Sequence, residues 1–291
     1  MTATRAQKKR LRDLVGTGSA HGVNIALGEI DGEGLERALD NGDELRVAVI
    51  QTITSKLREL SIPNEFADEE VVSSYGYLSG YRKPKSITEQ CNILRKLFPG
   101  VGNALEKLAE QPVLTGAEGW FAIPKWQTIA PTYGEAVEKV LAKLSQTREG
   151  KFYNYCKGQL GPDRLRQSIK AFQKLEGEQK DYDILVVAAQ FGINHRGRSV
   201  RRACEVMNSQ EFGLGAFAVG IMLLSHPERL QHYDDLWIDC AGDEYDCLVS
   251  GVRFDYAPGF RFEGGGVSFG TRWASGMHVR YGSASGFLPQ R

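Results

Sequence analysis

A cluster of cationic side chains is the first feature of the sequence with chemical potential. Residues 195–202 read His-Arg-Gly-Arg-Ser-Val-Arg-Arg, and Ser199 is a good N-cap residue, so the cluster should lie at the start of a helix. The N–H groups at a helix N-terminus can hold phosphate. Arginine is unfavourable at the positive end of the helix dipole, so we favour a structural pairing with acidic side chains. The expected partners are the pairs Asp234-Asp235 and Asp243-Glu244.

A second set of side chains could support nucleophilic catalysis. His195, His232, Asp239 and Cys240 include a thiol, two candidate bases and a carboxylate. A cleft joining His195, His232 and Asp239 would predict a small hydrolase or a nucleic-acid-processing enzyme that uses the 195–202 cluster as well. Cys240 alternates with Asp239 along a predicted strand, so its side chain should point the opposite way, into the core. The enzyme is therefore the alternative hypothesis.

Signals for metals and cofactors are weak. Asp239 and the pair Asp243-Glu244 could bind a cation, but their spacing is not that of a regular ligand set. The five cysteines are widely spaced and form no Cys-x-x-Cys pair, which predicts neither a zinc site nor a disulfide framework. Residues 16–22 contain a Gly-x-Gly, but no predicted strand precedes it, as a dinucleotide loop would require. We expect no cofactor and no metal.

The composition is that of a globular protein without a bias toward charged partners. The chain has 291 residues, a formal net charge of zero and 42% hydrophobic residues. Zero net charge gives no electrostatic reason to expect nucleic acid or a membrane surface. The basic stretch 5–12 is not followed by an apolar run, and the longest apolar stretch, 212–224, is too short to span a bilayer. We expect no nucleic-acid partner, no membrane span and, by default, a cytoplasmic location.

Lysine is distributed unevenly along the chain. Residues 1–180 contain 15 lysines, whereas residues 181–291 contain none. The length also favours two domains. We therefore predict a boundary near residue 180, between a mainly helical region 1–180, subdivided near 112–120, and a separate domain 181–291.

The elements needed to position these side chains follow from apolar periodicity. A period of about 3.6 residues predicts helices in the first part over 43–60, 86–98, 133–144 and 162–175. The segment 151–155 predicts an edge strand, and 120–126 is short and apolar. The second part predicts a strand, two helices and a strand, over 182–189, 199–207, 212–225 and 236–240.

From Val252 onward the period becomes two, which indicates short strands with two different faces. One face should be an apolar frame made of Val252, Phe254, Phe260, Phe262, Val267 and Phe269. The other should carry Arg253, Asp255, Gly259, Arg261, Glu263, Ser268 and Gly270. A solvent-exposed face of an antiparallel sheet explains this pattern. The mixture of Arg, Tyr, His and small residues is also typical of antibody-like binding surfaces.

Several segments resemble a known family. Phe191–Arg202, Glu211–Pro227, Tyr233–Tyr245 and Tyr281–Phe287 resemble proteins of small uncultivated bacteria whose ends differ mainly at interspersed positions. That pattern resembles the variable proteins of diversity-generating retroelements, in which an error-prone reverse transcriptase rewrites the 3′ end of the target gene. The resemblance implies an α+β fold in which a helical N-terminal region precedes a C-type-lectin-like domain. Paired disulfide cysteines and a carbohydrate-binding calcium motif are not evident, so the resemblance implies a shape and not sugar binding.

The resemblance also implies which residues vary. An Asn codon with both adenines randomised can encode every amino acid except Lys, Glu, Gln, Met and Trp. Glu263 and Met277 fall outside this set. The residues implied as the variable, ligand-binding surface all fall inside it: Arg253, Asp255, Tyr256, Gly259, Arg261, Ser268, Gly270, Thr271, Arg272, Ser275, His278 and Arg280. We expect a non-enzymatic protein that displays these residues to a variable ligand, most simply a protein, with the N-terminal region as a mount or assembly module.

Overall fold

The computed structural model describes residues 4–61, 64–158, 166–244 and 255–289, and it shows a mixed α+β protein with a helical N-terminal region and sheets toward the C-terminus. The chain divides into two compact units, Met1–Pro63 and Asn64–Arg291. Within the described parts, no helix is both long enough and apolar enough to cross a membrane.

The first unit consists of three helices, α1 (Arg5–Glu29), α2 (Gly32–Asp40) and α3 (Gly42–Ser61). Local capping explains where two of them begin. Thr4 and Gln7 form a capping box at α1, and the Asp31 side chain accepts a hydrogen bond from the backbone N–H of Gly34 at α2. The helix predicted over 43–60 is confirmed as α3.

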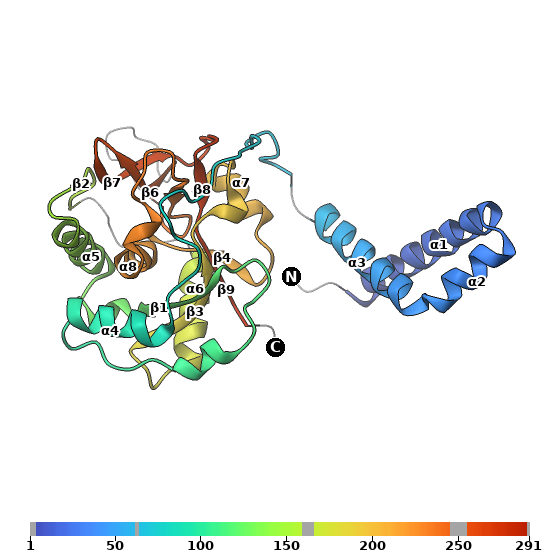
Figure 1. Cartoon of the computed structure of the whole chain (residues 1–291), viewed down its shortest axis with the longest axis horizontal. Coiled ribbons are helices and arrows are strands. Elements are labelled where there is room, and N and C mark those ends of the chain that lie inside the picture. Colours follow the sequence, from blue (N-terminus) through green and yellow to red (C-terminus); the bar gives the residue numbers. More distant parts are fainter. Residues whose placement is uncertain (1–3, 62–63, 159–165, 245–254, 290–291) are drawn as a thin grey trace. The chain divides into compact units, whose positions relative to one another are not determined.

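The second unit is built on two sheets (Figure 1). The four-stranded sheet is antiparallel and has the order β1 (Gly119–Pro124), β3 (Ile184–Gln190), β9 (Ser285–Phe287), β4 (Glu211–Gly213). The five-stranded sheet has the order β2 (Phe152–Asn154), β7 (Gly266–Trp273), β6 (Tyr256–Glu263), β5 (Trp237–Asp239), β8 (Tyr281–Ser283). Its pairs β2–β7 and β5–β8 are parallel. The edge strand predicted over 151–155 is confirmed as β2.

The helices of this unit are α4 (Ile87–Leu97), α5 (Tyr133–Thr147), α6 (Arg166–Glu178), α7 (Val200–Val206) and α8 (Ala216–Ser225). Short 3-10 turns lie at Glu106–Glu110, Trp126–Thr128, Ile193–His195 and Pro227–Arg229. Each of the α-helices lies within or overlaps a segment predicted to be helical. Ser86 and Ser199 are the N-caps of α4 and α7, because each side chain accepts a hydrogen bond from a backbone N–H of the first turn.

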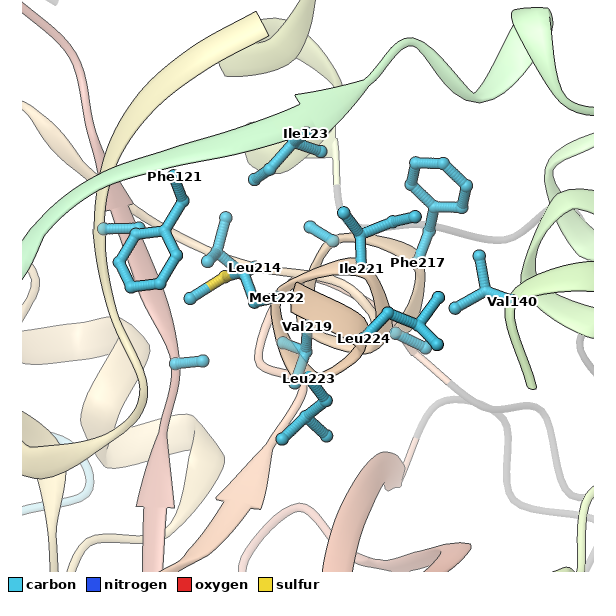
Figure 2. Close-up of a cluster of buried hydrophobic side chains, with 14 of the residues drawn as sticks. Phe121, Ile123, Val140, Leu214, Phe217, Val219, Ile221, Met222, Leu223 and Leu224 are labelled. Atoms are coloured by element: carbon cyan, nitrogen blue, oxygen red, sulfur yellow. The ribbon is translucent and has the colours of Figure 1, made fainter. Parts of the chain in front are cut away.

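Helix α8 forms the centre of the core, and every one of its residues is buried. Figure 2 shows Phe121 and Ile123 of β1 and Val140 of α5 around it. Gly220 lets α5 approach closely, since a Cβ atom there would lie 2.6 Å from a methyl carbon of Val140. The sequence around α8 is almost wholly apolar, which is why the helix needs neighbours on all sides.

The boundary predicted near residue 180 does not separate the two units. Strand β1 pairs with β3 from Gly119↔Ala189 to Pro124↔Ile184, and α5 packs against α8, so segments on both sides of residue 180 build one core. The subdivision near 112–120 falls within the same unit. Lysine ceases near residue 180 because the later segments supply much of the buried interior, where lysine is rarely found.

The C-terminal region forms a hairpin followed by two short strands. Gly264 and Gly265 join β6 to β7 with φ values of 60° and 80°, which only glycine adopts at little cost. The strands predicted around 260–262 and 267–269 are confirmed. The strand predicted at Val252 and Phe254 lies outside the described residues.

Candidate binding face

Strand register places alternate residues of four neighbouring strands on one face of the five-stranded sheet. Gly259 is opposite Gly270 and Asp239, and Trp237 is opposite Tyr281. We call this the outer face, and it is made of Trp237, Asp239, Gly259, Arg261, Ser268, Gly270, Arg272 and Tyr281. The opposite side carries Phe260, Val267 and Phe269, all essentially without solvent exposure. The predicted alternation is confirmed in β6 and β7, where these three residues form a buried frame.

The centre of the outer face is hollow because Gly259 and Gly270 have no side chains there. The hollow is small, with a volume of about 10 Å³. Asp239, Arg261, Arg272 and Tyr281 lie around it, together with Thr271 and Phe260. Two paired glycines therefore shape the middle of the surface.

Arg272 is fastened to the sheet by several contacts. Its Nε donates to Asp239 Oδ1 at 2.6 Å, and its two terminal nitrogens donate to Asp239 Oδ2 and the carbonyl of Gly276. The guanidinium also lies over the ring of Tyr281, 3.7 Å from its centroid. Burial would lower the pKa of Arg272, but the Asp239 carboxylate outweighs it and the pKa is raised. Since Asp239 is fully buried, Arg272 neutralises a charge that water cannot reach.

Ser268 differs from its predicted place on the surface. The Arg261 guanidinium Nε lies 2.8 Å from Glu263 Oε1 and 3.2 Å from Ser268 Oγ. Ser268 also donates to Glu263 and has no exposed surface. Arg261 and Glu263 form an ion pair bonded to this hydroxyl, which cannot touch a ligand as the face stands.

The two opposed glycines differ in the space around them. A Cβ atom on Gly259 would lie 2.9 Å from the backbone oxygen of Ile238, which is too close. A Cβ atom on Gly270 would meet carbon atoms of Tyr155 at 3.8 and 3.9 Å, which is ordinary contact. Gly259 is therefore required by the fold, whereas the position of Gly270 accepts a side chain.

The segment after β7 contributes a cationic and an aromatic side chain, Arg280 and His278, beside the outer face. Arg280 lies over the ring of Tyr233, 4.2 Å from its centroid, and donates to the Tyr75 hydroxyl at 3.2 Å. The ring of exposed His278 is nearly parallel to that of Trp237, with centroids 6.4 Å apart. Partial burial and the charges of Arg280 and Arg272 lower the pKa of His278, so the ring is neutral at pH 7.

The remaining predicted residues lie at the ends of β6 and β7 or just after them. Asp255 is half-buried, and its backbone oxygen accepts a hydrogen bond from Ala274. Tyr256 packs against Trp273 with ring centroids 4.4 Å apart. Thr271 and Ser275 are half-buried. Arg253 lies outside the described residues.

Sequence reasoning missed the aromatic members and neighbours of this surface, namely Tyr75, Tyr233, Trp237 and Tyr281. Trp237 alternates with Asp239, so the period of two already assigned both to one face. Tyr75 carried no such signal, because it reaches the site from a segment more than 150 residues earlier in the chain.

The acidic partners predicted for the basic cluster are wrong. The ion pairs of its arginines are Arg198–Glu70, Arg201–Glu69, Arg202–Glu70 and Arg202–Glu205. Asp235 instead accepts hydrogen bonds from the backbone N–H groups of Leu78 and Ser79. The acidic pair Glu69-Glu70 was visible in the sequence as a possible partner. No local sequence pattern, however, relates it to residues 198–202, which lie far along the chain. The cluster therefore anchors the 64–79 segment, which agrees with the structural role that we favoured over phosphate binding.

The catalytic set of the alternative hypothesis is not assembled. Buried His195 contacts Glu211 at 2.8 Å, exposed His232 lies near Asp234, and Asp239 holds Arg272. Burial would raise the pKa of Glu211, but hydrogen bonds from His195 and Ser285 outweigh it and the pKa is lowered. The described residues contain no group of three or more His, Cys, Asp or Glu side chains placed to hold a metal ion.

Cys240 occupies the core, as predicted. It has no exposed surface, and burial raises the pKa of its thiol well above the usual value. A protonated, enclosed thiol is not a nucleophile at neutral pH.

One buried histidine was not anticipated. His226 accepts a hydrogen bond at Nε2 from the Lys85 backbone N–H, at 2.9 Å, and its Nδ1 lies 3.1 Å from the carbonyl oxygen of Met222. Burial lowers the pKa of His226 to about 4. This neutral ring joins the end of α8 to the segment that leads into α4.

Comparisons with known proteins provide no family for the chain. Neither the protein-family models, nor the curated proteins, nor the solved structures gave a match. The outer face itself is therefore the basis on which a function can be argued.

Proposed function

We propose that this chain is a non-enzymatic binding protein that holds a protein ligand on its outer face and on the adjoining residues 274–280. The observation that carries the proposal is the division of one hairpin into two sides. Phe260, Val267 and Phe269 are buried, while Arg261 and Gly270 lie on the opposite side. A surface of this kind can change its contacts without changing its core.

The contacts divide the surface into required and exchangeable residues. Gly259, Ser268 and Arg272 are tied to the sheet by a close approach, by burial and by a buried ion pair. The second group consists of Gly270, where a side chain would fit, and of residues that are at least partly exposed to solvent, Asp255, Ser275 and His278. Exchange at the second group would alter what the face binds, while the first group keeps its shape.

The chemistry of the surface favours a protein ligand over a small molecule. Pockets for drug-sized ligands measure about 300–1,000 Å³, and the hollow, at about 10 Å³, lies far below that range. Half-exposed Tyr233 and the Arg280 side chain stacked on its ring are the residue types that dominate protein interfaces. The arginines Arg261, Arg272 and Arg280 have carboxylate partners, so they offer planar stacking surfaces more than unpaired charge.

We further propose that residues 253–280 are diversified by a retroelement on a C-type-lectin-like scaffold. The order β3, α7, α8, β5, with the short strand β4 between the two helices and the strands β6 to β9 after them, supports this fold. It agrees with the strand, helix, helix, strand order that the resemblance implies. Diversification would act on the exchangeable residues, and the required residues would be retained.

Two matched libraries test the division between surface and frame. One library randomises Asp255, Gly270, Ser275 and His278, and the other randomises Ala257, Phe260, Val267 and Phe269 in the same hairpin. Both are displayed on yeast and sorted for protease resistance, and the first is then sorted for binding to a panel of proteins. We expect most members of the first library and few of the second to stay folded, and new binders to arise from the first. Equal loss of folded members in both libraries would contradict the proposal.

The genomic neighbourhood tests diversification separately. We expect an adenine-rich near-copy of codons 250–285 and a reverse-transcriptase gene beside this gene or beside close relatives. If neither accompanies any of them, the diversification claim fails, while the binding claim still rests on the libraries.

A further inference from the structure

We infer that the N-terminal unit 1–63 is a self-association module, in which two copies lie antiparallel and the basic end of each faces the acidic end of the other. This inference is independent of the proposed ligand-binding function. It rests on exposed apolar surface and on the distribution of charge within the three helices.

The N-terminal unit has no core of its own. Among the described side chains of residues 4–57, none is buried. Large apolar side chains on all three helices are exposed by 42–71%: Leu11, Leu14, Val23, Ile25, Leu27, Ile30, Leu39, Leu45, Val47, Val49, Ile50 and Leu60. Exposed apolar surface of this density marks an interaction site in a protein that remains in solution.

The helices also need support beyond their own hydrogen bonds. Helix α1 contains Gly16, Gly18, Gly22 and Gly28, and glycine is among the poorest helix formers. Most helical stability in proteins comes from packing an apolar face against a neighbour. A partner that covers the apolar side chains would supply this packing.

Charge in the unit is separated along its length. Residues 5–12 contain five basic residues and no acid, whereas residues 29–44 contain seven acids and one arginine. Helix α1 rises about 1.5 Å per residue, so roughly 30 Å lie between its basic end and Glu29. That distance is about three Debye lengths at 0.1 M salt, so Glu29 and the basic end of α1 are screened from each other. Among the described residues, no carboxylate pairs with the basic side chains of 5–12.

A second copy of this chain can bring its acidic segment to the basic segment of the first. In an antiparallel pair, the basic segment of each copy meets the acidic segment of the other, and the same contact occurs twice about a two-fold axis. The apolar side chains between the segments are then covered in both copies. A second copy of this chain would therefore pair the charged segments and also cover the exposed apolar side chains.

The test uses the full chain and two charge-reversed variants. The acidic variant carries Lys8→Glu, Lys9→Glu and Arg12→Glu, so that both segments are negative. The basic variant carries Glu33→Lys, Glu36→Lys and Asp40→Lys, so that both are positive. A control carries Lys96→Glu, Lys107→Glu and Lys180→Glu, which make the same charge change on exposed residues of the second unit.

Sedimentation equilibrium gives the mass of each protein, and circular dichroism gives its helicity. We expect the natural chain and the control to form dimers that weaken as salt is raised. Each reversed variant alone should dissociate with a Kd higher by about tenfold or more, because several exposed pairs become repulsive at once. An equimolar mixture of the two variants should form a heterodimer with restored helicity.

Three results would overturn the inference. The natural chain could have the mass of one copy throughout the micromolar range. Either reversed variant could associate as tightly as the control. The mixture could fail to associate. The mixture keeps the inference falsifiable even if each variant alone loses helical structure.

Discussion

Arg272 and His278 lie six positions apart on the same surface, but only one of them supports the fold. Replacing Arg272 with Met should cost about 3–5 kcal/mol of unfolding free energy, because buried Asp239 would be left without its partner. Replacing exposed His278 with Ala should change the stability by no more than about 0.5 kcal/mol. Urea denaturation at pH 7 measures both.

The double variant Asp239→Asn with Arg272→Met is the control for this prediction. Removing the buried charge should raise the free energy of unfolding by at least about 1 kcal/mol relative to Arg272→Met alone, since the effects of substituting residues in contact are not additive. If Arg272→Met and His278→Ala cost the same, Arg272 does not have the structural role described above.

His226 should make the protein sensitive to mild acid. Its pKa is about 4 in the folded protein and about 6.5 when unfolded, so between these values the unfolded chain binds the extra proton. The contribution of neutral His226 to the free energy of unfolding is therefore fully present above about pH 6.5, and it decreases as the pH falls toward 4. The loss is on the order of 3 kcal/mol. His226→Gln should remove this part of the pH dependence, as measured by denaturant unfolding at several pH values.

Exposed His232 provides the matched control. His232→Gln makes the same substitution at an exposed ring, so it shows the effect of replacing a histidine as such. A slope that persists in His226→Gln would assign the acid sensitivity to other groups. Glu70 and Glu211 would not be among them, because their pKa values are lowered from 4.5 and the stability they contribute is lost at more acidic pH.

At the scale of the elements, the β6–β7 hairpin allows a direct comparison of two facing glycines. Gly259→Ala should cost about 1–3 kcal/mol, because its Cβ atom would press on the backbone of β5. Gly270→Ala should be neutral or slightly stabilising, because the site has room and glycine weakens a strand. Thermal unfolding of the two variants gives the difference, and equal effects would contradict the assignment of Gly259 to the scaffold.

Elements whose signal is local were predictable from the sequence. The helices and the period-two alternation of Phe260, Val267 and Phe269 depend on neighbouring residues, and these were confirmed. Strand β9 reads Ser-Gly-Phe and has no apolar run, so it is a strand only because β3 and β4 lie on either side of it. Ser268 could not be recognised as buried, because Arg261 and Glu263 enclose it through side-chain contacts.

Long-range pairing was the part that local rules could not supply. The partners of Arg198 and Arg201 lie about 130 residues earlier in the chain, and β1 meets β3 although α5, β2 and α6 lie between them in the sequence. Lysine content reported which segments are buried, and this was mistaken for a domain boundary. Composition describes exposure, and it does not reveal which strands share a sheet.

At the scale of the whole molecule, two fragments distinguish the observed division from the predicted one. Fragment 64–291 should fold and unfold cooperatively at the melting temperature of the same unit in the full chain, because it contains both sheets and the core. Fragment 181–291 should not fold, because it lacks β1, β2 and α5. Calorimetry measures both. A cooperative transition in fragment 181–291 would restore the boundary at residue 180.

The position of β9 has a consequence for how errors in the gene are handled. Strand β9 lies inside the four-stranded sheet, between β3 and β4, although it follows the whole surface hairpin in the sequence. A ribosome must therefore read past codon 287 before that sheet can close. Any frameshift or stop codon introduced across the hairpin removes the strand that holds β3 and β4 together. Faulty copies would fail to fold and would be degraded, so that only intact reading frames yield folded protein.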